Sequence, residues 1–437
     1  MMAAGNQPGA KAGTRGWRRL VVVGLLLLFP VTGCDALDEL ISVDLPGDME
    51  EGDLDDPRLA EVLVNSAQAD FECAFPRYVR QMGIWTLKIQ DGGQGRPSAL
   101  NSIRSSSYAF YADHCTGTEP NWAPLQTSRA QAARAVRLIE GFPEGSVENR
   151  AALLGRSRLY EAYSILLLSE AYCGVTVDLG PLLTRAEGFT IAEDRFTDVL
   201  EYAVQVADPE MSSYLTNSAL IGRARARLNL GDRAGVVEDA SRVEEDFVFY
   251  STHDDVPNRR TNNLYEYFII GTSGSIGVKY RPLRFLEEGV LDPRVPIVET
   301  NRVTGGGANI IWEPRFWQSE GDDLRVGTWR EAQMMIAEVE GGQTAVNIIN
   351  RLRSDYDLPT FSSTDPAEIT AQVREERMRE TFLQGTEVGD LLRWGGPWPT
   401  GFDERGRAID EANTCVWIPD YEVIANPNLR DSPTTPL

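Results

Sequence analysis

Two glutamates in the C-terminal third, Glu376 and Glu380, have the type and spacing that come closest to a catalytic pair. Paired carboxylates hydrolyse glycosidic bonds when they flank a cleft, one as an acid and the other as a base or nucleophile. Here both lie on one predicted helix, one turn apart, and they alternate with arginines, so helix-surface or partly buried ion pairs explain them more simply. We therefore predict no catalytic residues and no enzymatic activity.

A second set of side chains has the chemistry of a sugar-binding surface. Sugars present apolar C–H faces and hydroxyl edges, which bind to exposed aromatic rings and to nearby Asn, Asp, Arg or Gln side chains. Both classes occur in two segments, and the ligand contacts that we expect are Trp85, Trp122, Tyr280, Arg281, Asn309, Trp312, Arg315 and Trp317, with Gln90, Asp91, Asn121 and Phe316 beside them. The competing interpretation is that most of these tryptophans belong to the core.

Cys34 ends a segment with the profile of an export signal. Basic residues at positions 11, 15, 18 and 19 precede a short apolar run, and Val31-Thr32-Gly33 places small residues directly before the cysteine. A membrane span is the alternative, but a span needs roughly 20 apolar residues and this run breaks after about a dozen, at Pro30. We expect residues 1–33 to be a lipoprotein signal peptide and Cys34 to carry acyl chains that hold the protein at a bacterial membrane.

Residues 34–57 follow as an acidic tether, because positions 35–57 carry ten acidic residues and no basic one. Such a composition does not bury enough apolar surface to order itself. The acids directly after Cys34 fit either a sorting signal between membranes or a solvated spacer.

The charge of the chain excludes some functions. Removing residues 1–33 changes the formal charge from -23 to -27, and a field of that sign repels nucleic acid. The chain has only two histidines, His114 and His253, which are too few for most histidine-based metal or acid–base sites. Asp322-Asp323 alone offers too few oxygen ligands for calcium. We predict no cofactor, no metal and no nucleic-acid partner.

Four cysteines remain after Cys34, namely Cys73, Cys115, Cys173 and Cys415. An exported protein meets an oxidising compartment, so an even number of cysteines suggests disulfides. Three pairings are possible. We favour Cys73 with Cys115, which closes the shorter loop, and then Cys173 with Cys415.

Most of residues 58–437 carries helical patterns. Small and apolar residues recur at spacings of three and four in 148–172, and two further stretches, 219–243 and 332–352, read as helix, glycine turn and helix. Each such unit is about one tetratricopeptide repeat long and must stack on its neighbours. We predict helix pairs within 124–246 and 328–395, including 124–141 with 148–173 and a helix over 193–206. An ordinary irregular helical domain is the alternative.

Residues 247–327 differ, because they are rich in Gly, Asn, Asp, Pro and aromatics and have few helical stripes. We expect a large loop-rich insertion there. Ordered loops on a rigid scaffold are common binding surfaces.

The region from Glu375 to Gly395 resembles the RagB/SusD family of outer-membrane nutrient-uptake lipoproteins. The residues that carry the resemblance are Glu376, Arg377, Glu380, Phe382, Gly385, Asp390, Leu391, Arg393, Trp394 and Gly395. Asp292-Pro293-Arg294, the helix Ala345–Arg353 and Ile418-Pro419 also agree in order. The resemblance implies one all-α SusD-like domain over 58–437, with a tetratricopeptide-like helical scaffold below the ligand-binding insertion. Asp390, Arg393 and Trp394 are expected to be structural, fixing the end of their helix against the repeats.

By resemblance, the protein is a lipid-anchored, surface-exposed outer-membrane protein. It would capture an oligosaccharide or similar nutrient and deliver it to a SusC-like TonB-dependent transporter. The rival interpretation is a helical-repeat scaffold that faces the periplasm and docks other proteins. A lipid-anchored hydrolase is a third option, against which the lack of a credible carboxylate pair or nucleophile motif counts.

Overall fold

The computed structural model describes residues 56–91, 122–256, 259–286, 289–305, 310–398, 401–402, 408–409 and 415–429. The signal peptide, Cys34, nearly all of the tether, Cys115, Asn121 and Asn309 lie outside them. The main helices are α2 (Ala60–Trp85), α4 (Trp122–Gly141), α5 (Arg150–Ala171), α6 (Arg185–Ala203), α7 (Pro209–Leu230), α8 (Arg233–Ala240), α10 (Trp329–Glu340), α11 (Gly342–Ser354), α12 (Pro366–Glu380), α13 (Glu387–Trp394) and α14 (Asp420–Ala425). None of the helices in this part of the chain has the length and apolar character of a membrane span.

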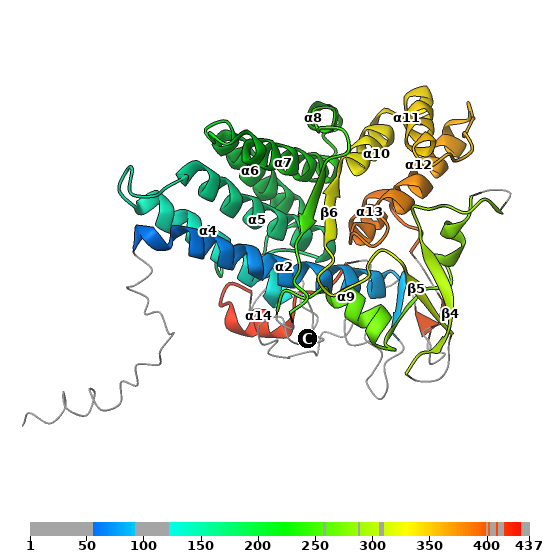
Figure 1. The fold of residues 1–437 in the computed structure, drawn as a ribbon, viewed down its shortest axis with the longest axis horizontal. Helices are drawn as coiled ribbons and strands as arrows, with labels where there is room; N and C mark the ends of the chain where they lie inside the picture. The colour runs from blue at the N-terminus through cyan, green and yellow to red at the C-terminus, as the bar shows by residue number, and fades with distance from the viewer. Residues whose placement is uncertain are drawn as a thin grey trace, which may run out of the picture. The chain divides into compact units, whose positions relative to one another are not determined.

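These helices pack against one another in chain order, as expected of tetratricopeptide-like repeats. Helix α2 packs on α4, α4 on α5, α5 on α6 and α6 on α7 (Figure 1). The row continues through α8 to α10, and α10 contacts α11 and α12. The predicted all-α scaffold of helix pairs is confirmed.

Local sequence sets where these helices begin and end. Thr184 and Glu187 form a capping box, in which the threonine hydroxyl accepts a bond from the N–H of Glu187 and the glutamate accepts one from the N–H of Thr184. Helix α6 therefore starts at Arg185, earlier than the predicted 193. Helix α7 ends at Leu230, and the following Gly231, whose φ of 80° suits a glycine, turns the chain into α8.

Small residues let neighbouring helices approach closely. A Cβ on Gly222 of α7 would collide with the ring of Phe196 of α6. A Cβ on Gly155 of α5 would lie 2.7 Å from Cδ1 of Leu215, also on α7. The small-residue stripes predicted from sequence therefore lie at helix contacts.

Helix α2 was not predicted, although it is the longest helix of the described residues. It buries polar residues such as Asp70, Glu72 and Arg80 together with Phe71 and Tyr78. These buried polar side chains interrupt the periodic pattern of apolar residues from which a helix is predicted.

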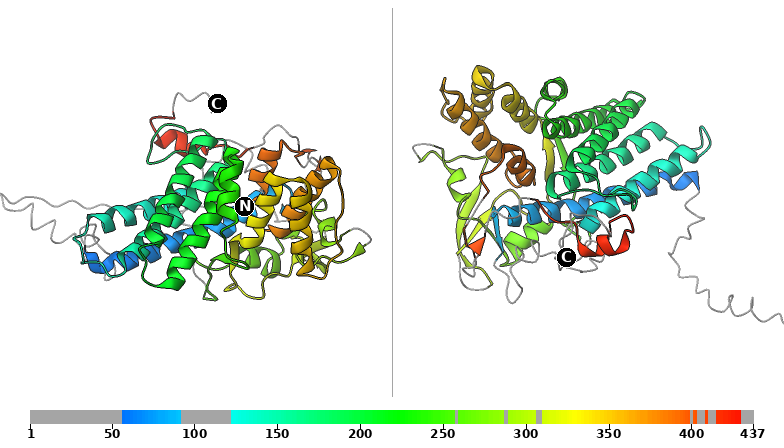
Figure 2. Two further views of the ribbon diagram at one scale, coloured as in Figure 1. Left: turned by 90° about the horizontal axis from the view of Figure 1, so that it is seen from above. Right: turned by 180° about the vertical axis from the view of Figure 1, so that it is seen from behind.

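The insertion at 247–327 is built on strands as well as loops. Its two ends meet where β2 (Val248–Ser251) pairs antiparallel with β6 (Leu324–Thr328), and β4 (Ile297–Val303) forms a hairpin with β5 (Ile310–Pro314). Strand β1 (Ile89–Asp91), which follows α2, pairs with β3 (Gly274–Ile276). Short helices α9 (Asn263–Tyr265), η3 (Glu266–Ile270) and η4 (Arg281–Arg284) join the strands. Figure 2 shows this strand region at one end of the helical row, beside α12 and α13.

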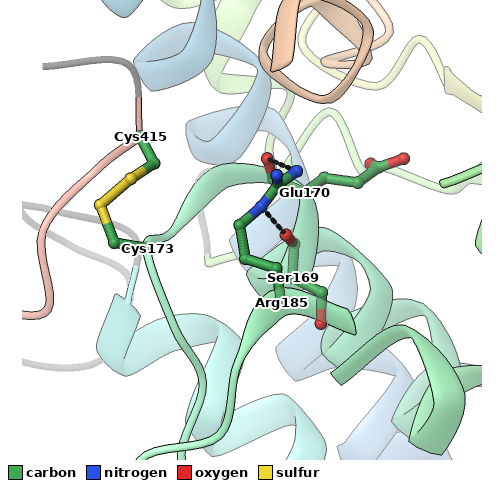
Figure 3. Close-up of a disulfide and its surroundings, with 5 residues drawn as sticks. All are labelled: Ser169, Glu170, Cys173, Arg185 and Cys415. Atoms are coloured by element: carbon green, nitrogen blue, oxygen red, sulfur yellow. Dashed lines mark hydrogen bonds between the residues drawn. A yellow bond between two sulfur atoms is a disulfide. The ribbon is translucent and has the colours of Figure 1, made fainter. Parts of the chain in front are cut away.

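A disulfide joins Cys173, just after α5, to Cys415 in the C-terminal segment, which is the pairing favoured above (Figure 3). A bridge between Tyr172 and Val416 reinforces this link. Arg185 of α6 lies nearby, and its Nε donates a 2.8 Å bond to the carbonyl of Ser169. Cys73 is also disulfide-bonded, and Cys115, its favoured partner, lies outside the described residues.

Candidate functional site

A buried ion-pair network joins the insertion to α12. Arg294 donates from Nη2 to Asp292 at 2.7 Å, and its Nη1 reaches Glu376 at 2.5 Å and Glu380 at 2.9 Å. All four side chains are nearly inaccessible to solvent. The Asp292-Pro293-Arg294 motif therefore anchors the insertion on the helix that carries the two glutamates.

This network decides what Glu376 and Glu380 do. Burial by itself would raise the pKa of Glu376, but the charges and hydrogen bonds of Arg294 and Arg353 outweigh it and hold the pKa below its usual value. A carboxylate held ionised between two guanidinium groups is a poor general acid. The geometry supports the structural interpretation of this pair.

A second network holds α13 against the repeats. Asp390 accepts bonds from Arg377 Nε at 2.9 Å and from Arg393 Nη2 at 2.7 Å. Arg393 Nε and the indole Nε1 of Trp394 both donate to Glu338 of α10, at 2.8 Å and 2.9 Å. The expected carboxylate–guanidinium contact, with the indole beside it, is present and fixes the end of this helix.

The loop after α2 is tied to α13 by another buried pair. The ammonium group of Lys88 contacts the carboxylate of Glu387, and both side chains are buried. Lys88 also lies 5.3 Å from the centroid of the Tyr280 ring and 5.0 Å from that of Phe382. Aromatic rings and one carboxylate thus surround this ammonium group.

Strands β1, β3 and β5 lie side by side and bring distant residues together. Gln90 pairs with Ser275 across β1 and β3, and Ser275 accepts a 2.9 Å bond at Oγ from the backbone N–H of Trp312 on β5. Trp312 is half-buried.

Two arginines from the short helix η4 pack on this indole. The guanidinium carbons of Arg281 and Arg284 lie 5.0 Å and 5.3 Å from the Trp312 ring centroid. Arg284 also lies 4.7 Å from the ring centroid of Phe285, which is 39% exposed, and Arg281 Nη2 reaches Gln90 Oε1 at 3.5 Å. We call Gln90, Arg281, Arg284, Phe285 and Trp312 the Trp312 surface.

The Trp312 surface offers ring faces, guanidinium donors and an amide within one small area. Such a combination can stack on an apolar ligand face and pair with polar groups at its edge. It is therefore the candidate binding site of the described residues.

The C-terminal part of the chain is similar to a known protein family. Residues 331–426, which include the helices of both networks, match the model of the SusD family. Over these residues the chain is similar to the SusD family. A comparison with curated proteins found no match.

Solved structures share the fold of this chain. A SusD-like carbohydrate-binding protein from Bacteroides vulgatus is 14% identical, with 85% of this chain and 97% of that chain covered and a TM-score of 0.62. A SusD superfamily protein from the same species is 15% identical, with 87% and 99% covered and a TM-score of 0.63. Surface glycan-binding protein A from Bacteroides fluxus is 14% identical, with 86% and 98% covered and a TM-score of 0.62. At these identities the likeness shows the fold alone.

Four of the aromatic residues predicted to contact ligand are buried, and for them the prediction was wrong. Trp85 and Trp122 have no exposed area, and Tyr280 and Trp317 are each 8% exposed. Trp122 packs on Tyr172, and the Tyr280 hydroxyl donates to the carbonyl of Thr86. These rings are occupied by the core and have no free face to offer a ligand.

The other predicted contacts divide differently. Trp312 and Arg281 lie together on the Trp312 surface, whereas Arg315 is exposed and pairs with Glu313 at 2.5 Å. Phe316 packs near Phe382 in the core, and Asn309 lies outside the described residues. These positions remain predictions as ligand contacts.

Arg284 and Phe285 were not predicted from the sequence as members of this surface. Both follow Arg281 closely in the run Arg281-Pro282-Leu283-Arg284-Phe285, where a proline starts η4. One turn of a 3-10 helix spans three residues, so positions 281 and 284 fall on the same side. That spacing was the signal available in the sequence.

Proposed function

We propose that this protein binds an oligosaccharide at the Trp312 surface. In this proposal it works without catalysis and passes the bound sugar to a SusC-like TonB-dependent transporter of the outer membrane. Lipid on Cys34 holds it there, exposed at the cell surface, and the acidic tether gives it reach.

The observation that carries the proposal is the half-buried Trp312 indole, flanked by two arginines and close to Gln90. A sugar ring stacks on an indole through its C–H face, while guanidinium and amide groups pair with its hydroxyl groups. Two structural neighbours are described as carbohydrate-binding and glycan-binding proteins, which supports the same chemistry here.

The buried networks support a rigid site. Asp292 and Arg294 fix the chain that follows η4 onto α12. Lys88, which directly precedes β1, fixes that strand onto α13 through its pair with Glu387. Binding to a pre-ordered surface avoids the entropy cost of ordering loops. In this picture the helical row is the platform and the strands present the ligand contacts.

A gentle detergent pull-down of the lipidated protein from its native outer membrane tests the delivery step. We expect a TonB-dependent β-barrel to be recovered in stoichiometric amount. Recovery of no barrel under several mild conditions would contradict the delivery step and favour a scaffold that faces the periplasm.

A further inference from the structure

We infer that the oligosaccharide bound at the Trp312 surface carries anionic groups, either uronate carboxylates or sulfate esters. The inference rests on the proposed function and names the class of sugar. The paired guanidinium groups of Arg281 and Arg284 carry the argument.

Among the described residues, neither arginine forms an ion pair with a carboxylate. No carboxylate of the described residues lies within 4.0 Å of Arg281 or Arg284, although the chain has 65 acidic residues and only 42 Lys and Arg. Arg281 donates to the carbonyl of Ile276 and contacts Gln90, so its hydrogen bonds go to neutral groups. The Nε of Arg284 is buried and has no hydrogen-bond partner in this part of the chain.

Neighbouring arginines behave differently. Arg302 pairs with Glu313 at 3.1 Å, Arg315 pairs with the same carboxylate, and Arg294 faces three carboxylates. These three arginines near the β4–β5 hairpin each have a carboxylate partner. The two guanidinium groups on Trp312 have no carboxylate within 4.0 Å in the described part of the chain, so two positive charges remain for a ligand.

The local electrostatics agree with this assignment. Partial burial lowers the pKa of Arg281, and the charge of Glu299 only partly offsets the effect. Glu299 is exposed and lies across from Trp312 in the β4–β5 pair. A bound anion would stabilise both arginines and would be repelled by Glu299, so Glu299 tunes the affinity.

Guanidinium groups match the chemistry of both anions. Their planar array of N–H donors pairs with two oxygens of a carboxylate or a sulfate at once. The Trp312 ring can stack on the sugar that carries the charge. A neutral sugar would leave two partly desolvated cations without an opposite charge, which costs affinity.

The test is an array of oligosaccharides in which every acidic chain is printed beside its neutral counterpart. Uronate chains are paired with their methyl esters and sulfated chains with their desulfated forms, so the array also separates the two sources of charge. The probe is the full-length lipoprotein in detergent, and the affinity of each hit is then measured by calorimetry.

We expect wild-type protein to bind an acidic chain at least about tenfold more tightly than its neutral counterpart. Arg281→Gln and Arg284→Gln should each weaken acidic binding about tenfold or more, since each loses a charge-assisted hydrogen bond. Glu299→Gln should strengthen it. Arg233→Gln is the matched control, because Arg233 is an exposed arginine on α8 and its loss should change nothing.

The outcomes separate the inference from the proposed function. Equal or tighter binding of the neutral counterpart would overturn the anionic assignment and leave sugar binding intact. Binding to no chain on the array would overturn both. The wild-type comparison of acidic and neutral chains needs no variant, so it decides the inference even if Arg281→Gln fails to fold.

Discussion

Replacing Arg294 with methionine is the sharpest test of how the insertion is held on the scaffold. The guanidinium group of Arg294 contacts Asp292 of the insertion and Glu376 and Glu380 of α12, all of them buried. Methionine fills a similar volume but removes the positive charge, so the three carboxylates repel one another more strongly. We expect a large loss of stability from this single change.

The size of the loss follows from what remains. Removing one partner of a buried ion pair costs about 3–5 kcal/mol. Each carboxylate keeps a second guanidinium partner, and these pairs are Asp292 with Arg379, Glu376 with Arg353, and Glu380 with Arg330. Because these partners remain, we expect the loss of stability to lie near the lower end of that range, at about 3 kcal/mol.

The loss should depend on pH in a defined direction. The pKa of Glu376 lies below its usual value, since Arg294 and Arg353 outweigh the opposing effect of burial. Its charged form therefore stabilises the wild type above the unfolded pKa of about 4.3, and this contribution is lost as pH falls through the lower folded pKa. In Arg294→Met the pKa of Glu376 rises, so the stability difference from wild type should narrow as pH falls from 7 towards 4.

Urea unfolding followed by tryptophan fluorescence measures this difference at each pH. Arg351→Met is the control, because Arg351 also pairs with two acids, Glu245 and Asp355, but is 51% exposed. Exposed pairs contribute little, so this variant should unfold at nearly the wild-type urea concentration. A loss of less than about 1 kcal/mol in Arg294→Met, or one that does not change with pH, would refute the reasoning.

Three further predictions concern other parts of the chain. Trp312→Ala should reduce sugar affinity and leave the unfolding transition unchanged, whereas Trp317→Ala should cost about 3–5 kcal/mol of stability because its ring is buried. Calorimetry measures the sugar affinity of each variant and urea unfolding measures its stability. The reverse pattern would show that the sugar binds at Trp317 and not at Trp312. Gly222→Ala should lower the free energy of unfolding by about 1–3 kcal/mol because the added methyl group meets the Phe196 ring. Adding Phe196→Leu should recover part of this stability. No loss of stability in the single variant would show that the two helices can move apart freely. Cys415→Ser opens a disulfide that spans 242 residues, so limited proteolysis should cut the C-terminal segment sooner than in wild type, and an unchanged digestion pattern would show that packing alone holds the segment.

The sequence predicted the helical scaffold well because its signals are local. Glycine turns such as Gly231 and close-packing residues such as Gly222 depend on neighbours within one or two helices. The charged motif around Asp390 was interpreted correctly for the same reason, since an arginine three residues later is within reach of the carboxylate. Patterns of this range are visible in a single sequence.

The ligand surface was harder to predict, because exposure is a property of the whole fold. Trp85 and Trp312 are the same residue type, yet one lies in the core and the other is half-buried beside two arginines. Helix α2 escaped prediction because its buried Asp70 and Glu72 are matched by Arg259 and Arg260, which lie almost 190 residues later. Pairs at that distance leave no periodic trace in the sequence.

A crystal structure of the protein with a bound oligosaccharide, chosen from the array, tests the central claim most directly. We predict a sugar ring stacked on the Trp312 indole, with polar groups of the sugar within hydrogen-bonding distance of Arg281 and Arg284. A sugar bound elsewhere, with the Trp312 indole left bare, would contradict the account.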